Sequence, residues 1–214
     1  MGLMTMYDAF QNATSNNKQF THFTIDDVDF AANLFVPLKF CQPFRLTGNG
    51  EGIQISAINA GNVLGGTIWR ISRESDEVVY AVDFNHKIER HLDRSHIETI
   101  FRPSLLITDC LNFDLQHQPR SKRDAELIKS VMACLVGGGD VLLPVDAAGR
   151  SLELLLLLHS HWKINALVGR FSLVFLAHTA RHSIDFANSM LEWTNGRCQK
   201  EFDASKRSPF DFEF

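Results

Sequence analysis

The residue types best suited to chemistry lie in the stretch AGNVLGGTIWRI…VVYAVDFNHKIERHL, residues 60–92. A glycine-flanked loop presents Asn62 after one predicted strand, and Asp83 ends a later strand. Two strand ends can present ligands to one ion cluster, with His as the nitrogen donor and Asp as a bridging oxygen donor. The loop position where a His would serve is Asn62, whose amide is a poor zinc ligand.

These positions also have structural interpretations. Asp83 is as well explained by a strand-end carboxylate that caps backbone N–H groups as by a vestigial ligand. Asn62 is better explained by a turn that places it in a left-handed conformation. Asp109, which follows the apolar run PSLLIT, is also expected to be structural.

Two histidine pairs have weaker signals. HSH at 159–161 has HxH spacing but lacks a following Asp-His, and on a helix its two side chains would point about 200° apart. We interpret both as helix-end histidines. HTARH at 178–182 has the spacing of HExxH, but Thr179 replaces the catalytic Glu, so it is interpreted as a helix start at the surface.

Basic residues offer two candidate contacts for phosphate. Arg150 follows Gly149 after a predicted strand, where a helix N-terminus and a guanidinium could meet a phosphate or RNA. An Arg–carboxylate pair that supports the fold is an equal alternative. RSKR at 120–123 is interpreted as a solvated approach to a helix, with RNA contact as the minor alternative.

Composition narrows the class of protein. The chain has 214 residues, 45% of them hydrophobic, with a net charge of −4. This charge argues against a dominant surface for binding phosphates without regard to sequence. No secretory signal is evident, and the longest apolar run, 154–158, is too short to span a bilayer. The four cysteines lack metal-site spacing and are expected to be reduced core thiols. We expect a soluble intracellular protein with no membrane contact.

The predicted elements divide the chain near Asn112. Before it, helices are expected over residues 1–10 and from Thr24, and a short one near 93–101. Strands are expected at 53–57, 67–72, 77–84 and 103–109, the last buried on both faces, with a hairpin turn at 73–76. After Asn112, helices at 127–135, 147–162 and 183–193 alternate with a buried strand at 140–145 and a strand at 171–177. That alternation favours parallel pairing. The Phe-rich tail is expected to lack a terminal element and to await a partner segment.

Five segments carry a family resemblance: FTIDDVD (23–29), LGGTIWRI (64–71), VVYAVDFNHK (78–87), RPSLLITD (102–109) and VLLPVDAAGRSLEL (141–154). They resemble the RNA-processing nucleases whose metallo-β-lactamase domain carries a β-CASP insert, and the resemblance covers nearly the whole chain. LGGTIW and YAVDFNHK are similar to the non-catalytic paralogues of the nuclease in particular. The AGRxxE piece is shared more widely.

The resemblance implies an α/β fold: a partial metallo-β-lactamase αββα sandwich over residues 1–112 and the start of a β-CASP domain over 113–214. It makes Asn62, Asp83 and Asp109 vestigial metal positions, with no catalytic residue, no bound metal and no cofactor. The family's HxHxDH motif would lie before residue 1 and further His ligands after residue 214. We therefore expect an internal fragment that exposes apolar sheet surface and is marginally stable alone.

The function implied is that of a non-catalytic subunit of the nuclear complex that cleaves and polyadenylates pre-mRNA. Its implied partners are the nuclease paralogue, a symplekin-like scaffold and pre-mRNA, contacted directly or through the complex. The first alternative is an active metal-dependent RNA endonuclease with ligands outside this chain. The second is an α/β interaction module unrelated to polyadenylation.

Overall fold

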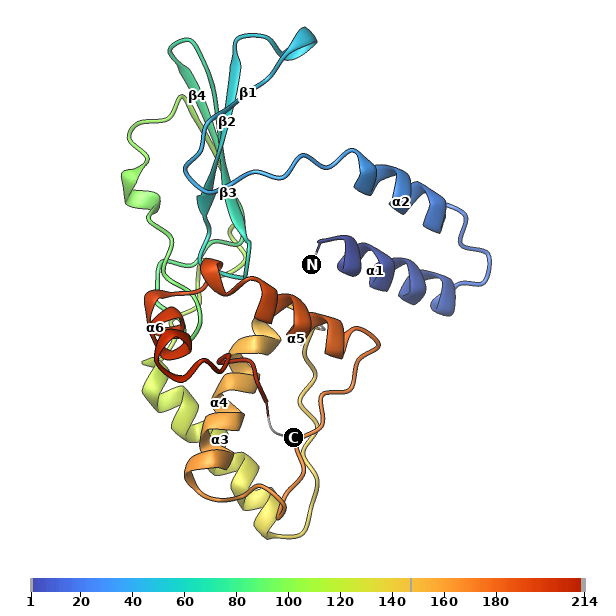
Figure 1. The fold of residues 1–214 in the computed structure, drawn as a ribbon, viewed down its shortest axis with the longest axis vertical. Coiled ribbons are helices and arrows are strands. Elements are labelled where there is room, and N and C mark those ends of the chain that lie inside the picture. The colour runs from blue at the N-terminus through green and yellow to red at the C-terminus, as the bar shows by residue number, and fades with distance from the viewer. Residues whose placement is uncertain (1, 147, 213–214) are drawn as a thin grey trace.

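The computed structural model describes residues 2–146 and 148–212. A twisted sheet lies at one end of an elongated molecule and a group of helices lies at the other, while an N-terminal helical hairpin projects to one side (Figure 1). Residues 82–104 run from the sheet to the helical end and back, and the chain leaves the sheet again after residue 108.

The sheet has the strand order β1-β2-β3-β4-β5. Its strands are β1 (Phe44–Arg45), β2 (Ile53–Asn59), β3 (Thr67–Arg73), β4 (Asp76–Ala81) and β5 (Leu105–Thr108). The first four pair antiparallel, and β5 runs parallel to β4. Arg73 faces Asp76 across a two-residue turn in which Glu74 has φ 55°, which confirms the predicted hairpin.

One face of this sheet has a small core. Ile68, Val79 and Ala81 are fully buried there, with Ile97 and Ile100 of the connection packed over them. The predicted helix near 93–101 is a 3-10 turn, η2 (Ile97–Thr99). The prediction that the strand at 103–109 is buried on both faces is wrong, because β5 is an edge strand with a single neighbour and all four of its residues are exposed.

The N-terminal hairpin pairs α1 (Gly2–Asn16) with α2 (Ile25–Asn33). The predicted helix start at Thr24 is confirmed, because its hydroxyl accepts from the Asp27 N–H and the Asp27 carboxylate accepts from the Thr24 N–H. The Tyr7 hydroxyl also donates to the Asp29 carboxylate. Met4 at the start of α1 is buried and lies 3.9 Å from the Ser183 hydroxyl.

The helical end consists of α3 (Arg120–Val136), α4 (Arg150–Ile164), α5 (Ala180–Ser189), η3 (Leu191–Trp193) and α6 (Gly196–Ser205). One core joins α4 and α5 to the connection between β4 and β5. It contains Leu152 of α4, Ala187 of α5, Leu92 of the connection, and Phe210 of the tail. A second joins α3 to α4 through Val131 and Trp162. As expected, α4 is buried on several sides.

The two strands predicted after residue 112 do not form. Residues 140–145 and 171–177 belong to no strand or sheet, and Leu142 and Leu176 are 88% and 92% exposed. An apolar run becomes a strand only when another strand supplies its hydrogen bonds, and the sheet of the described residues ends at β5.

One prediction for the tail and one for the cysteines are wrong. The tail does form an element, α6, and Phe210 is fully buried within the chain. Phe214, the last residue of the Phe-rich tail, lies outside the described residues, and the expected partner segment stays a prediction. Of the four free cysteines only Cys198 is buried, whereas Cys41, Cys110 and Cys134 are exposed. None of the described helices is both long enough and apolar enough to cross a bilayer.

Candidate functional site

Asp83 and Asp109 lie side by side where β4 and β5 end. The backbone N–H of Asp83, which has φ 55°, donates to Asp109 Oδ2 at 2.9 Å. Asp109 Oδ1 also accepts from the Leu111 N–H at 3.1 Å, and these bonds lower the pKa of Asp109. The capping carboxylate is therefore Asp109, and Asp83 is the residue whose backbone it caps.

Asn62 lies in the loop between β2 and β3. The prediction of a left-handed Asn62 is wrong, because the left-handed residues of this loop are Gly61 (φ 70°) and Gly65 (φ 78°). At Gly61 a Cβ would stand 2.6 Å from the Ser95 nitrogen and 2.7 Å from the Asn85 oxygen. The loop therefore needs glycine at 61 to dock its backbone against the segment that follows β4.

The described residues do not by themselves assemble a metal site. Among the described residues, no three His, Cys, Asp or Glu side chains gather where they could hold a metal ion. Asp83 and Asp109 are brought together, and Asn62, where the family resemblance places a His, carries an amide, which is a poor zinc ligand.

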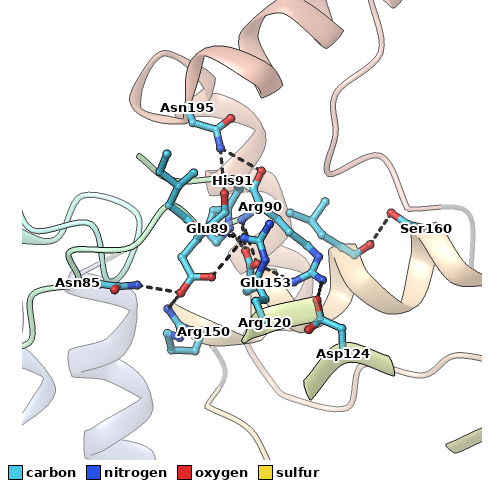
Figure 2. Close-up of polar contacts among 12 residues, drawn as sticks. Asn85, Glu89, Arg90, His91, Arg120, Asp124, Arg150, Glu153, Ser160 and Asn195 are labelled. Carbon is cyan, nitrogen blue, oxygen red and sulfur yellow. Dashed lines mark hydrogen bonds and ion pairs between the residues drawn. The ribbon is translucent and has the colours of Figure 1, made fainter. Parts of the chain in front are cut away.

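The densest polar cluster involves residues 85–92, here called the bridging segment, which links the sheet to the helices (Figure 2). Its centre is Glu153 of α4, a buried carboxylate. Glu153 accepts from the Arg90 N–H at 2.9 and 3.0 Å and from Arg90 Nη1 at 2.8 Å. His91 Nδ1 lies 3.0 Å from the same carboxylate, and Arg90 Nη2 pairs with Asp124 of α3.

The electrostatics of this cluster favour its charged form. Burial alone would raise the pKa of Glu153, but the hydrogen bonds from His91 and Arg90 outweigh it and lower the pKa to about 2. Burial would lower the pKa of Arg90, and the hydrogen bonds to Asp124 and Glu153 raise it. Glu153 is thus a permanent carboxylate at neutral pH.

A second buried carboxylate, Glu89, pairs with Arg150. Arg150 Nη1 donates to Glu89 Oε1 at 2.9 Å, which confirms the expected Arg–carboxylate pair, while the side chain stays 47% exposed and its contact with phosphate stays a prediction. Asn85 Nδ2 donates to the same oxygen at 2.8 Å. Arg120, the first residue of RSKR, donates to the Ile88 carbonyl at 3.0 Å.

Asn195, which precedes α6, also holds the bridging segment by hydrogen bonds. Its side-chain amide donates to the Glu89 and Arg90 carbonyls at 3.2 and 3.1 Å, and its backbone N–H donates to the His91 carbonyl at 2.9 Å. Its side-chain oxygen caps α6 by accepting from the Cys198 N–H at 3.0 Å. Burial raises the pKa of the Cys198 thiol to about 11.

The cluster therefore joins the sheet connection to α3, α4 and α6. It contains none of Asn62, Asp83 and Asp109, and only Arg150 among the predicted site residues belongs to it. A signal for Glu153 was present in the sequence, because a single Glu in the apolar run SLELLLLL requires a buried partner.

The two histidine pairs form no metal site with the residues described. His159 and His161 are both on α4, as expected, and their rings stack edge-on with Phe212 and Trp162 respectively. His178 lies in the turn before α5, and His182 lies in its first turn.

Residues 1–107, half of the chain, match the metallo-beta-lactamase superfamily domain, and the chain belongs to that superfamily. This confirms the predicted α/β metallo-β-lactamase fold class. The boundary near Asn112 stays a prediction.

Three similar proteins refine the comparison. The chain is 41% identical over 211 residues to the Cleavage and polyadenylation specificity factor subunit 2 of Arabidopsis thaliana, covering 98% of this chain and 28% of that protein. It is 41% identical over 216 residues to the probable subunit 2 of Drosophila melanogaster, covering 100% and 28%. An endoribonuclease of Yarrowia lipolytica is 28% identical over 171 residues, covering 80% and 21%. The chain thus spans about a quarter of the length of these relatives.

Proposed function

We propose that this chain is part of a non-catalytic subunit of the machinery that cleaves and polyadenylates pre-mRNA 3′ ends. The observation that carries the proposal is the set of possible donors: Asp83 and Asp109 meet, and the loop after β2 carries Asn62 where the family resemblance places a His. Similarity to proteins named as subunit 2, over nearly the whole chain, supports the choice of process.

The ion pairs formed by the two charged residues of the AGRxxE motif support a scaffolding role. Its Arg150 pairs with Glu89 and its Glu153 with Arg90, so both charged positions are engaged in holding the fold together. Such a subunit would act by assembling with the nuclease paralogue and a symplekin-like scaffold in the nucleus, on pre-mRNA.

An active RNA endonuclease is the second candidate. Two features favour it: Asp83 and Asp109 are adjacent at neighbouring strand ends, and the chain is similar to an endoribonuclease over 80% of its length. Ligands contributed from outside this chain would then complete the metal centre.

A combined metal and cleavage measurement on the full-length natural protein separates the candidates. We expect no stoichiometric zinc, no cleavage of a polyadenylation-site RNA, and co-purification with polyadenylation factors. Two bound metal ions, together with cleavage that is lost in Asp83→Ala, would establish the endonuclease instead. Absence of polyadenylation factors from the purified material would favour an unrelated interaction module.

A further inference from the structure

One face of α2 carries apolar side chains that the described chain leaves uncovered. In the N-terminal hairpin α1 lies toward the helical end, and α2 packs against α1 beyond it (Figure 1). Phe30 and Leu34, one helical turn apart, are 68% and 66% exposed, and the exposed Phe35 and Val36 follow them. Val28, on the other side of the helix, is buried. We call Phe30, Leu34, Phe35 and Val36 the apolar row.

The hairpin that presents the apolar row is acidic. Residues 2–38 carry four Asp side chains and one Lys, a net charge of −3 out of the −4 of the whole chain. The four are Asp8, Asp26, Asp27 and Asp29. None of them forms an ion pair with another residue that the structure describes. The negative charge of this part of the chain is therefore not neutralised within it.

Two of these carboxylates already serve the hairpin, but both keep their charge. Asp29 accepts from the Tyr7 hydroxyl, and Asp27 closes the capping box with Thr24. The hydrogen bonds from the backbone N–H and the hydroxyl of Thr24 lower the pKa of Asp27. Asp26 is exposed and lies one turn before Phe30 on the same face of α2. Negative charge therefore adjoins one end of the apolar row.

We propose that this face of α2 docks an amphipathic helix of a partner protein that carries Lys or Arg beside its apolar side chains. Apolar side chains one turn apart are the contacts that two packed helices make, and they are the usual anchors of a docked helix. The apolar side chains of the partner would cover Phe30 and Leu34 while its cations face Asp26 and Asp27. A second copy of the chain would instead bring another hairpin of net charge −3 to the same surface.

Charge complementarity decides the kind of partner. Carboxylates that are not neutralised attract a cationic partner and disfavour an acidic one, because like charges brought together at an interface repel each other. The partner is defined by its chemistry alone, so this inference stands apart from the proposed function in pre-mRNA processing.

The test uses the full chain and two fluorescein-labelled helical peptides, one of Leu and Lys and one of Leu and Glu in the same amphipathic pattern. Binding is followed by fluorescence anisotropy. The surface variant is Phe30→Ala/Leu34→Ala, which keeps good helix formers in α2. Its control, Leu142→Ala/Leu176→Ala, removes two still more exposed apolar side chains far from the hairpin in sequence. Circular dichroism checks that both variants are folded like the parent chain.

We expect the parent chain to bind the Leu/Lys peptide about tenfold more tightly than the Leu/Glu peptide. The surface variant should bind the Leu/Lys peptide about tenfold more weakly than the parent, and the control within about twofold of it. Asp26→Asn should weaken binding and its dependence on salt. The matched Asp114→Asn, at an exposed position in the turn after β5, should change neither.

The proposal fails if the parent chain binds both peptides equally or binds neither. It also fails if the surface variant and its control lose the same affinity. Light scattering of the parent chain tests the other occupant. A dimer that dissociates in Phe30→Ala/Leu34→Ala would assign the face to a second copy and overturn the proposal, whereas a monomer that binds the Leu/Lys peptide supports it.

Discussion

Replacing Glu153 by Gln tests whether the buried cluster holds the sheet and helices together. The change keeps the size of the side chain but removes the charge that Arg90 and His91 contact at 2.8 and 3.0 Å. Removing one partner of a buried ion pair costs about 3–5 kcal/mol. Because Asp124 still pairs with Arg90, we expect the lower end of that range, about 3 kcal/mol.

The pKa of Glu153 leads to the same magnitude. A fall from its ordinary value of 4.5 to about 2 corresponds to about 3 kcal/mol, at 1.36 kcal/mol per pH unit. Because the pKa is lower in the folded chain, this stabilisation is fully present above pH 4.5 and is lost as the pH falls towards 2. The difference between the parent chain and Glu153→Gln should shrink over that pH window.

Urea unfolding of the full chain, followed by circular dichroism at neutral and acidic pH, measures both effects. The matched control is Glu98→Gln, whose carboxylate also contacts an Arg and a His but lies 52% exposed at the surface. We expect that control to leave the unfolding midpoint nearly unchanged. If Glu153→Gln unfolds no more readily than Glu98→Gln, the cluster does not hold the two parts together. If Glu153→Gln cannot be obtained folded, the milder Asp124→Asn should still lower the midpoint below that of the control.

Three other substitutions test separate features. Gly61→Ala places a Cβ 2.6 Å from the Ser95 nitrogen at a φ of 70°, so the thermal midpoint should fall by clearly more than for Gly2→Ala, whose Cβ meets nothing within 4 Å. Phe210→Ala empties a fully buried position and should lower the free energy of unfolding by about 3–5 kcal/mol, whereas an unchanged midpoint would mean that the tail is not docked. Thr24→Ala removes the N-cap of α2 at a cost of about 1 kcal/mol, and hydrogen exchange should accelerate in that helix alone.

The antiparallel part of the sheet could be predicted because its signals are local. Alternation of apolar residues at 53–57 and the polar turn at 73–76 are enough to define neighbouring strands. The capping box at Thr24 is equally local. The strands expected at 140–145 and 171–177 failed because a strand depends on a partner elsewhere, which the apolar run itself does not encode.

The candidate site was harder to predict for the same reason. Sequence reasoning found Asp83 and Asp109 and their strand ends, but which of the two caps the other depends on pairing between β4 and β5. Glu153 and Asn195 were missed, because their partners lie 63 and 106 residues away. The helix α6 was missed because it is largely polar, although Asn195 is a typical N-cap residue.

The bridging segment has a consequence for synthesis on the ribosome. Its Glu89 carbonyl receives a hydrogen bond from Asn195, which is 106 residues later in the chain. At about 5–20 residues translated per second, the nascent segment waits roughly 5–20 s before that donor is made. Within this interval Asp124 and Glu153 are made, so the segment can attach to α3 and α4 before Asn195 attaches it to α6. The attachment of the bridging segment is therefore completed only after α6 begins to be translated, long after the segment itself.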